Sequence, residues 1–157
     1  MSSLNSLHQL CIAKAVSISV AESCTSGIIA SKLTTLSGSS SYFKGGIVAY
    51  QNEIKTKFLA VSQSIINEKT EVSPEVVVQM AKSVLEKFNT DFSIASSGYA
   101  GPTGGTNKNP IGTVFIAIAS KFDVAVSRFI FLGDRQSIAN QASESALSLL
   151  LTEIKKQ

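Results

Sequence analysis

Hydrophobic and polar positions alternate with two different periods along this chain, and the two periods predict strands and helices in turn. Apolar residues alternate over residues 17–21 and then recur at helical spacing over residues 28–33. This change of period predicts a strand, a tight turn and a helix. Continued along the chain, the pattern predicts the order helix, strand, helix, strand, helix, helix, strand, strand, strand, helix. Such alternation is typical of helices that cover both faces of one sheet.

The strands predicted after the first are residues 46–50, 91–97, 113–120 and 124–132. Ser73-Pro74-Glu75 begins the best-marked helix, because a capping hydroxyl, a proline and an acid stand in its first positions. We expect residues 60–72 to form a connection and residues 121–123 to turn a hairpin. The fold is therefore predicted to be a single α/β domain over residues 1–157, a three-layer α/β/α arrangement with a mixed, mostly parallel sheet. Eight strand residues are predicted to lie in its core: Val20, Ile47, Val48, Ile94, Ala95, Val114, Ile116 and Ile118.

Composition narrows the classes of function. The 157 residues are 44% hydrophobic and 16% charged, with a net charge of +3, which suits one soluble domain and gives no basic patch for nucleic acid. No run resembles a signal peptide or a membrane span, so we expect no membrane partner. Cys11 and Cys24 form neither a disulfide framework nor a zinc pattern, and the default location is a reducing cytoplasm.

Histidine is nearly absent from the chain. The single histidine, His8, falls in the amphipathic first helix. A Ser-His-Asp or Cys-His mechanism would therefore have to use His8, and a histidine-rich zinc site is excluded.

Two polar turns follow predicted strands. In the first, residues 21–27, Ser23, Cys24 and Thr25 stand between a strand and a helix, where ligands of open α/β sheets bind. These hydroxyls equally suit plain helix caps. The second, residues 98–106, has four glycines in its first eight positions, so its free N–H groups suit a phosphate or an oxyanion. A flexible connection explains it as well.

A serine nucleophile needs a base, and without histidine the next candidate is a lysine that is neutral at working pH. Tyr50 and Lys55 flank the end of a strand and the start of a helix, so both can face the same sheet edge as Ser23. Spacing alone favours an ordinary solvated helix lysine at position 55, and it does not decide the matter.

Several motifs, in order and spacing, resemble the CinA C-terminal domain family. They are Ala21-Glu22-Ser23-Cys24-Thr25-x-Gly27, then Gly38-Ser39-Ser40-x-Tyr42-Phe43-x-Gly45-Gly46-x-Val48-x-Tyr50-x-Asn52-Glu53-x-Lys55, then Ser97-Gly98-x-Ala100-Gly101-Pro102-x-Gly104-Gly105, and then Pro110-x-Gly112-Thr113-Val114. The active members of that family are nicotinamide-nucleotide amidases. The resemblance implies hydrolysis of nicotinamide mononucleotide to nicotinic acid mononucleotide and ammonia, with no metal and no cofactor.

The resemblance also implies residue roles. Ser23 would be the nucleophile, Lys55 its general base and Tyr50 a partner in the proton network. Arg135 would meet the phosphate or hold the wall of the site. The other implied substrate-binding residues are Glu22, Thr25, Ser97, Gly101, Gly104 and Gly105.

The chain departs from the family pattern at two positions. Ser26 replaces a usual glycine, where a side chain can crowd the turn, and Tyr99 replaces a usual aliphatic residue, where a ring can narrow the cavity. Without the amino-terminal domain of longer members, the chain is expected to be a stand-alone amidase. Two other functions stay open: a catalytically silent nucleotide-binding or regulatory protein, and a serine amidase for another small amide. A homo-oligomer also stays open.

Overall fold

The computed structural model describes residues 2–157, which form five strands, six α-helices and one 3₁₀ helix. The strands are β1 (Ile18–Glu22), β2 (Phe43–Val48), β3 (Phe92–Gly98), β4 (Thr113–Ser120) and β5 (Val124–Ile130). The helices are α1 (Ser3–Lys14), α2 (Ile28–Leu33), α3 (Asn52–Leu59), α4 (Gln63–Lys69), α5 (Pro74–Phe88) and α6 (Arg135–Lys155), with the 3₁₀ helix η1 at Ser39–Ser41.

The strands pair in the order β2-β1-β3-β4-β5. β1 is parallel to both β2 and β3, whereas β4 is antiparallel to both β3 and β5. Four of the five strands therefore run in the same direction and only β4 is reversed. The prediction of a mixed, mostly parallel sheet is confirmed, and so is the β4–β5 hairpin at its edge.

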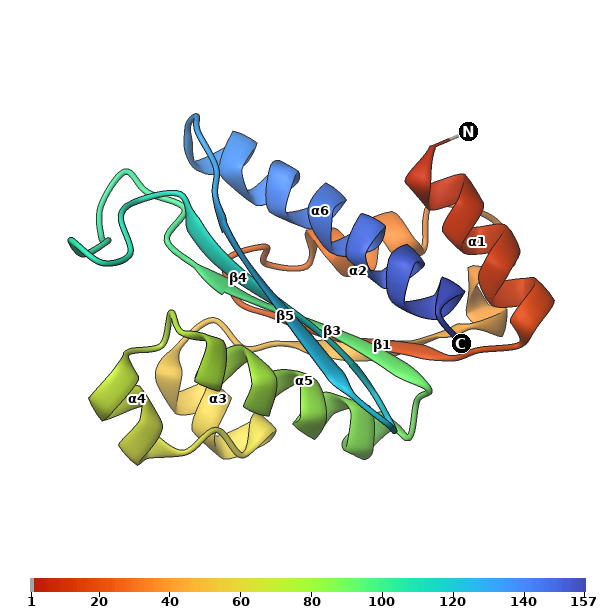
Figure 1. Cartoon of the computed structure of the whole chain (residues 1–157), viewed down its shortest axis with the longest axis horizontal. Coiled ribbons are helices and arrows are strands. Elements are labelled where there is room, and N and C mark those ends of the chain that lie inside the picture. The colour runs from red at the N-terminus through yellow and green to blue at the C-terminus, as the bar shows by residue number, and fades with distance from the viewer. Residues whose placement is uncertain (1) are drawn as a thin grey trace.

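Helices cover both faces of the sheet, as Figure 1 shows. α1, α2 and α6 lie on one face, and α3, α4 and α5 lie on the other. Each face has its own core. On the first, α6 contributes Ile138, Ala142, Ala146, Leu150 and Ile154, and on the second, α5 contributes Val76, Val77, Met80, Ala81 and Val84. The predicted three-layer arrangement is confirmed.

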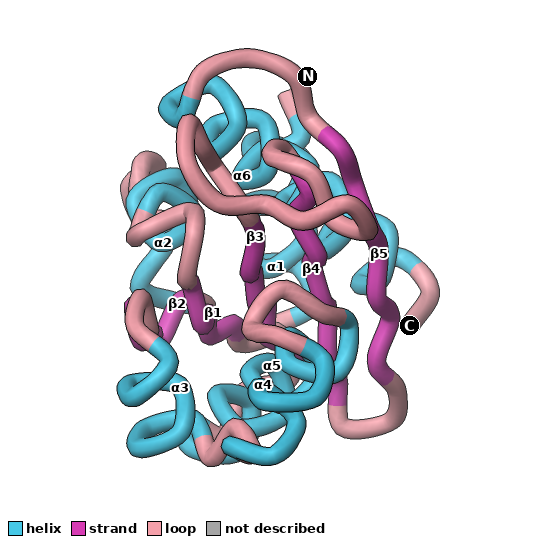
Figure 2. The backbone as a smooth tube through the Cα atoms, turned by 90° about the vertical axis from the view of Figure 1, so that its left-hand side faces the viewer, coloured by secondary structure: helices cyan, strands magenta, loops and turns pink. Residues whose placement is uncertain are grey.

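β2 is an edge strand, and this corrects part of the predicted core (Figure 2). Its burial alternates along the strand, so Ile47 is partly buried and Val48 is 50% exposed. The strand also begins at Phe43, three residues before the predicted start. Gly46 lies within this strand, and only glycine fits there, because a Cβ at this position would lie 2.4 Å from the Val20 carbonyl oxygen. The other six residues predicted for the core are buried.

One further element differs from the sequence prediction. Residues 63–69, expected to be part of a connection, form α4, of which only Ile66 is buried. Because one buried position gives no helical period, the pattern did not reveal this helix. α5 begins as predicted, with the Ser73 hydroxyl accepting a hydrogen bond from the Val76 N–H and Pro74 in the first turn.

Candidate active site

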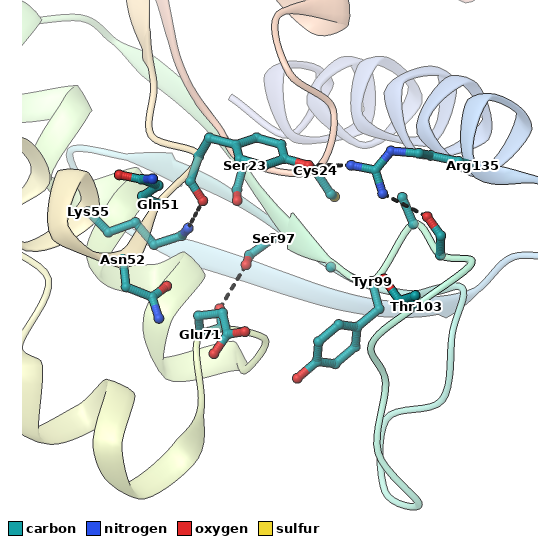
Figure 3. Close-up of a pocket in the computed structure, with 14 residues that line it drawn as sticks. Ser23, Cys24, Gln51, Asn52, Lys55, Glu71, Ser97, Tyr99, Thr103 and Arg135 are labelled. Atoms are coloured by element: carbon teal, nitrogen blue, oxygen red, sulfur yellow. Dashed lines mark hydrogen bonds between the residues drawn. The ribbon is translucent and has the colours of Figure 1, made fainter.

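A cavity of about 350 Å³ opens at the carboxyl ends of the three neighbouring parallel strands, as Figure 3 shows in close-up. Ser23 and Cys24 follow β1, while Tyr50, Gln51, Asn52 and Lys55 follow β2. Parallel strands present their carboxyl ends at one edge of a sheet, so segments far apart in sequence meet there. The rest of the lining is Glu71, Ser97, Gly98, Tyr99, Ala100, Gly101, Thr103 and Arg135. The volume lies within the range of small-molecule sites.

The turn between β1 and α2 fixes the position of Ser23. The Ser23 N–H donates to the Ser96 carbonyl oxygen at 3.1 Å, which ties the end of β1 to β3. Ser26 and Gly27 then adopt left-handed conformations, with φ of 46° and 99°, and turn the chain into α2. Ser23 itself is 8% exposed and lines the cavity.

Glu22 and Thr25 lie beneath this turn and not in the cavity lining. Both are fully buried. The Glu22 carboxylate accepts hydrogen bonds from the Thr25 hydroxyl at 2.6 Å and from the N–H groups of Ile29 and Ala30 at 2.9 and 3.0 Å. The direct substrate contact expected of Glu22 and Thr25 therefore needs correction, because their polar atoms are occupied in holding the turn and the start of α2.

Lys55 extends from α3 into the cavity wall and is only 1% exposed. Its Nζ donates a hydrogen bond to the Tyr50 carbonyl oxygen at 2.9 Å. Burial lowers the pKa of Lys55, and the negative charge of Glu71 opposes that shift only in part. No ion pair in residues 2–157 includes Lys55. Sequence spacing favoured a solvated lysine at position 55, and this is wrong: Lys55 is buried and has no counter-ion among the described residues.

Tyr50 takes part in the site differently from the expectation. Its backbone carbonyl, and not its phenol, receives the Lys55 hydrogen bond, and its side chain is 51% exposed. The phenol oxygen instead accepts a hydrogen bond from Arg135 Nη2, while Arg135 Nη1 donates to the Gly101 carbonyl oxygen at 2.7 Å. Arg135 therefore joins the start of α6 to two walls of the cavity, one from the β2–α3 segment and one from the glycine-rich loop.

Only some of the substrate-binding residues expected at the end of β3 and in the glycine-rich loop line the cavity. Ser97 and Gly101 line the cavity, whereas Gly104 and Gly105 do not. A Cβ on Gly105 would lie 2.8 Å from the Ile111 backbone nitrogen, and one on Gly104 would lie 3.2 Å from the Tyr99 ring. These two glycines are therefore required by the packing of the loop on itself, and their placement does not support a direct ligand contact.

Comparison with known proteins gives the same family that the motifs resemble. A family model described as the CinA C-terminal domain matches residues 2–154. The chain belongs to the CinA C-terminal domain family. It is 45% identical over 150 residues to a CinA-like protein of Flavobacterium psychrophilum and 42% identical over 142 residues to one of Desulfotalea psychrophila. These matches cover 96% and 90% of this chain but 36% and 34% of the relatives, so the chain spans about a third of their length.

Solved CinA structures match over almost the whole chain. A CinA superfamily protein from Klebsiella pneumoniae superposes with a TM-score of 0.94 at 28% identity and 100% coverage of both chains. One from Escherichia coli gives 0.90 at 33% identity, covering 96% of this chain and 90% of that one. The three-layer fold described above is thus the fold of solved CinA proteins.

The two departures from the CinA motif pattern have different structural outcomes. Ser26 is exposed, so its side chain points away from the turn and does not crowd it. Its left-handed φ of 46° gives a physical reason for glycine at this position. Tyr99 lines the cavity and its ring packs against Gly104.

Several lining residues of this CinA domain were not found from the sequence. Gln51, Asn52 and Thr103 gave no chemical signal, and Glu71 fell in a segment expected to be a plain connection. Cys24, which the sequence placed in the turn where ligands bind but to which it gave no role, lines the cavity with a thiol whose pKa burial raises to about 12. Residues 2–157 hold no cluster of three or more His, Cys, Asp or Glu suited to a metal ion. None of their helices combines the length and apolar character needed to cross a bilayer.

Proposed function

We propose that this CinA domain hydrolyses the carboxamide of nicotinamide mononucleotide, giving nicotinic acid mononucleotide and ammonia. The observation that carries the proposal is the buried Lys55, which has a lowered pKa and no carboxylate partner and lines the same cavity as Ser23 (Figure 3). A neutral lysine beside a serine is a base and nucleophile pair that needs no histidine. Burial of an unpaired lysine destabilises a protein, so its presence here favours a catalytic role.

In the proposed first step, neutral Lys55 takes the proton of the Ser23 hydroxyl as Oγ attacks the carboxamide carbon. The tetrahedral intermediate then collapses, the carbon–nitrogen bond breaks, and protonated Lys55 gives its proton to the leaving amide nitrogen, which departs as ammonia. The product of this step is an ester between Ser23 and the nicotinoyl group. Water attacks that ester with Lys55 again as base, which releases the carboxylic acid and restores the Ser23 hydroxyl.

The proposed contacts to the nucleotide lie on the opposite wall. Arg135 is exposed and carries a full positive charge, and the Gly101 carbonyl and the Tyr50 phenol hold its guanidinium in place. A fixed guanidinium suits a phosphate group. Gly101 and Ser97 also line the cavity. We assign the phosphate to Arg135 and the carboxamide to Ser23 and Lys55.

The test is ammonia release from nicotinamide mononucleotide by the purified protein, with and without excess EDTA, and with Ser23→Ala as the control. We expect turnover that EDTA does not reduce and that Ser23→Ala abolishes. Tight binding of the nucleotide without turnover would favour a silent nucleotide-binding or regulatory protein. Turnover of simple amides but not of the nucleotide would favour a serine amidase of another specificity. A complete loss of activity in EDTA that is reversed by added metal would argue against Lys55 as the general base.

A further inference from the structure

Glu71 is an acidic residue of the cavity wall that has no counter-ion. It is partly buried, and no ion pair within residues 2–157 includes it. Its negative charge raises the pKa of Lys55 and so opposes the effect of burial. The Lys55 amine, however, donates its hydrogen bond to the Tyr50 carbonyl oxygen and not to Glu71. An acid placed in a cavity wall without a cationic partner is a candidate for ligand contact.

The backbone around Glu71 is held in place at three successive carbonyl groups. The Thr70 oxygen accepts from the Ser73 hydroxyl at 3.1 Å, the Glu71 oxygen from the Ser97 hydroxyl at 2.7 Å, and the Val72 oxygen from Asn109 Nδ2 at 3.3 Å. Ser97 of β3 and Asn109, which lies between the glycine-rich loop and β4, thereby hold the segment. This framework fixes the backbone of Glu71 in the cavity wall.

Thr70 shows that this placement has a conformational cost. Its φ of 67° and ψ of 167° fall in a region that is essentially restricted to glycine, and a β-branched residue is especially disfavoured there. Strained backbone of this kind is found where a ligand site requires a particular geometry. The strained residue comes directly before the one acid that lines the cavity.

The cavity consequently carries opposite charges on different walls. In Figure 3, Glu71 lies below Ser97, whereas Arg135 lies to the right, beyond Ser23 and Cys24. A ligand with one cationic and one anionic group matches this arrangement. Nicotinamide mononucleotide is such a ligand, because its pyridinium ring is positive and its phosphate is negative.

We propose that Glu71 forms a subsite for the positive charge of the substrate ring and so makes the enzyme selective for amides on a cationic heteroaromatic ring. The inference rests on the proposed function for the identity of the substrate. The subsite also predicts that the affinity for the ligand depends on the charge of its ring, and this affinity can be measured without turnover.

The decisive comparison uses two ligands that differ by one hydride on the ring, which removes the positive charge of the ring. Reduced nicotinamide mononucleotide keeps the carboxamide, ribose and phosphate, but its dihydropyridine ring is uncharged. Binding of each form is measured by calorimetry to the full chain carrying Ser23→Ala, with and without Glu71→Gln. We expect Glu71→Gln to weaken binding of the oxidised form about tenfold, as for one partly screened charge pair, and to change binding of the reduced form less than twofold.

Glu68→Gln is the matched control. Glu68 is an exposed acid three residues away that does not line this cavity, so the change in net charge is the same. It should leave the affinity for both forms unchanged. An indirect effect through Lys55 has the opposite sign: loss of the Glu71 charge favours neutral Lys55, which reduces repulsion of a cationic ring.

Each result separates the two proposals. Equal weakening of both forms by Glu71→Gln, or no weakening of either, overturns the subsite even if the wild-type protein releases ammonia. Loss of binding that is confined to the oxidised form supports the subsite even if the wild-type protein turns over neither ligand. In that second case only the proposed hydrolysis fails.

Discussion

The Lys55 amine nitrogen lies 2.9 Å from the backbone carbonyl oxygen of Tyr50, five residues before it in the chain, and is shielded from solvent. A carbonyl orients the amine without supplying the full negative charge that a carboxylate would. Burial lowers the pKa of Lys55, so its proton is held weakly, which is the condition for a lysine to act as a base.

Ser23 and Lys55 should behave as one unit in catalysis. Ser23→Ala and Lys55→Ala should each lower kcat on the order of 10³-fold or more, and the double variant should lose little beyond either single one. Lys55→Arg should not restore activity, because a guanidinium stays protonated. Steady-state kinetics of ammonia release provides the measurement, and additive losses in the double variant would contradict the pairing.

The rate should rise with pH through the pKa of Lys55. Only neutral Lys55 can take the Ser23 proton, and burial places its pKa below the usual value for lysine. Glu71 and Cys24 are the groups whose charge acts on it, so Glu71→Gln should move the rising limb to lower pH. A pH profile of kcat/KM reports both effects, and a profile unchanged by Glu71→Gln would show that the limb belongs to another group.

Lys55 should also lower the stability of the protein at neutral pH. In the unfolded chain a lysine keeps its ordinary pKa of about 10.4. Between the lowered pKa and that value the unfolded state binds more protons, so the free energy of unfolding should rise with pH across this window. Lys55→Met should remove that slope and raise the free energy of unfolding at pH 7.

Urea denaturation of the wild-type and Lys55→Met proteins at pH 7 to 10 measures both quantities. In the unfolded chain the Cys24 and Cys11 thiols also ionise within this range, whereas burial raises the pKa of both to about 12 in the folded protein, so the comparison between the two proteins isolates the part due to Lys55. Parallel stability curves for the two would mean that Lys55 keeps its ordinary pKa in the folded protein.

Cys24 should not replace Ser23 as nucleophile. Burial raises the pKa of its thiol to about 12, and it does the same for Cys11, so both cysteines are overwhelmingly protonated at pH 8. Cys24→Ala should keep most of kcat, and iodoacetamide should modify the native protein far more slowly than the urea-unfolded one. Full activity of Ser23→Ala together with loss of activity in Cys24→Ala would move the nucleophile one residue along the turn.

Ser26→Gly should stabilise the fold by a few tenths to about 1 kcal/mol. Ser26 has a φ of 46°, which is unfavourable for any residue with a Cβ, and its exposed side chain makes no hydrogen bond that the change would remove. Ser26→Ala is the control, since alanine keeps the Cβ and should give no gain. Equal effects of the two substitutions on urea denaturation would show that the conformation at position 26 is not strained.

The sequence by itself determined the strand–turn–helix at Ser23, the start of α5 at Ser73 and the order of all elements except α4 and η1, because each depends on neighbours within a few residues. The period of apolar residues selects strand or helix locally, and a capping hydroxyl acts over a single turn. The motifs also identified Ser23, Lys55, Ser97 and Arg135 as residues of one site, and all four line the cavity.

Tertiary structure alone decided which strand is an edge and what each polar group contacts. Val48 and Val20 occupy similar apolar runs, yet Val48 is exposed because β2 has a neighbour on one side only. The Tyr50 phenol reaches Arg135, 85 residues away, instead of Lys55. Glu71 enters the cavity because Ser97 and Asn109 hold its segment. Pairings over such sequence separations leave no local period, so only the folded chain shows them.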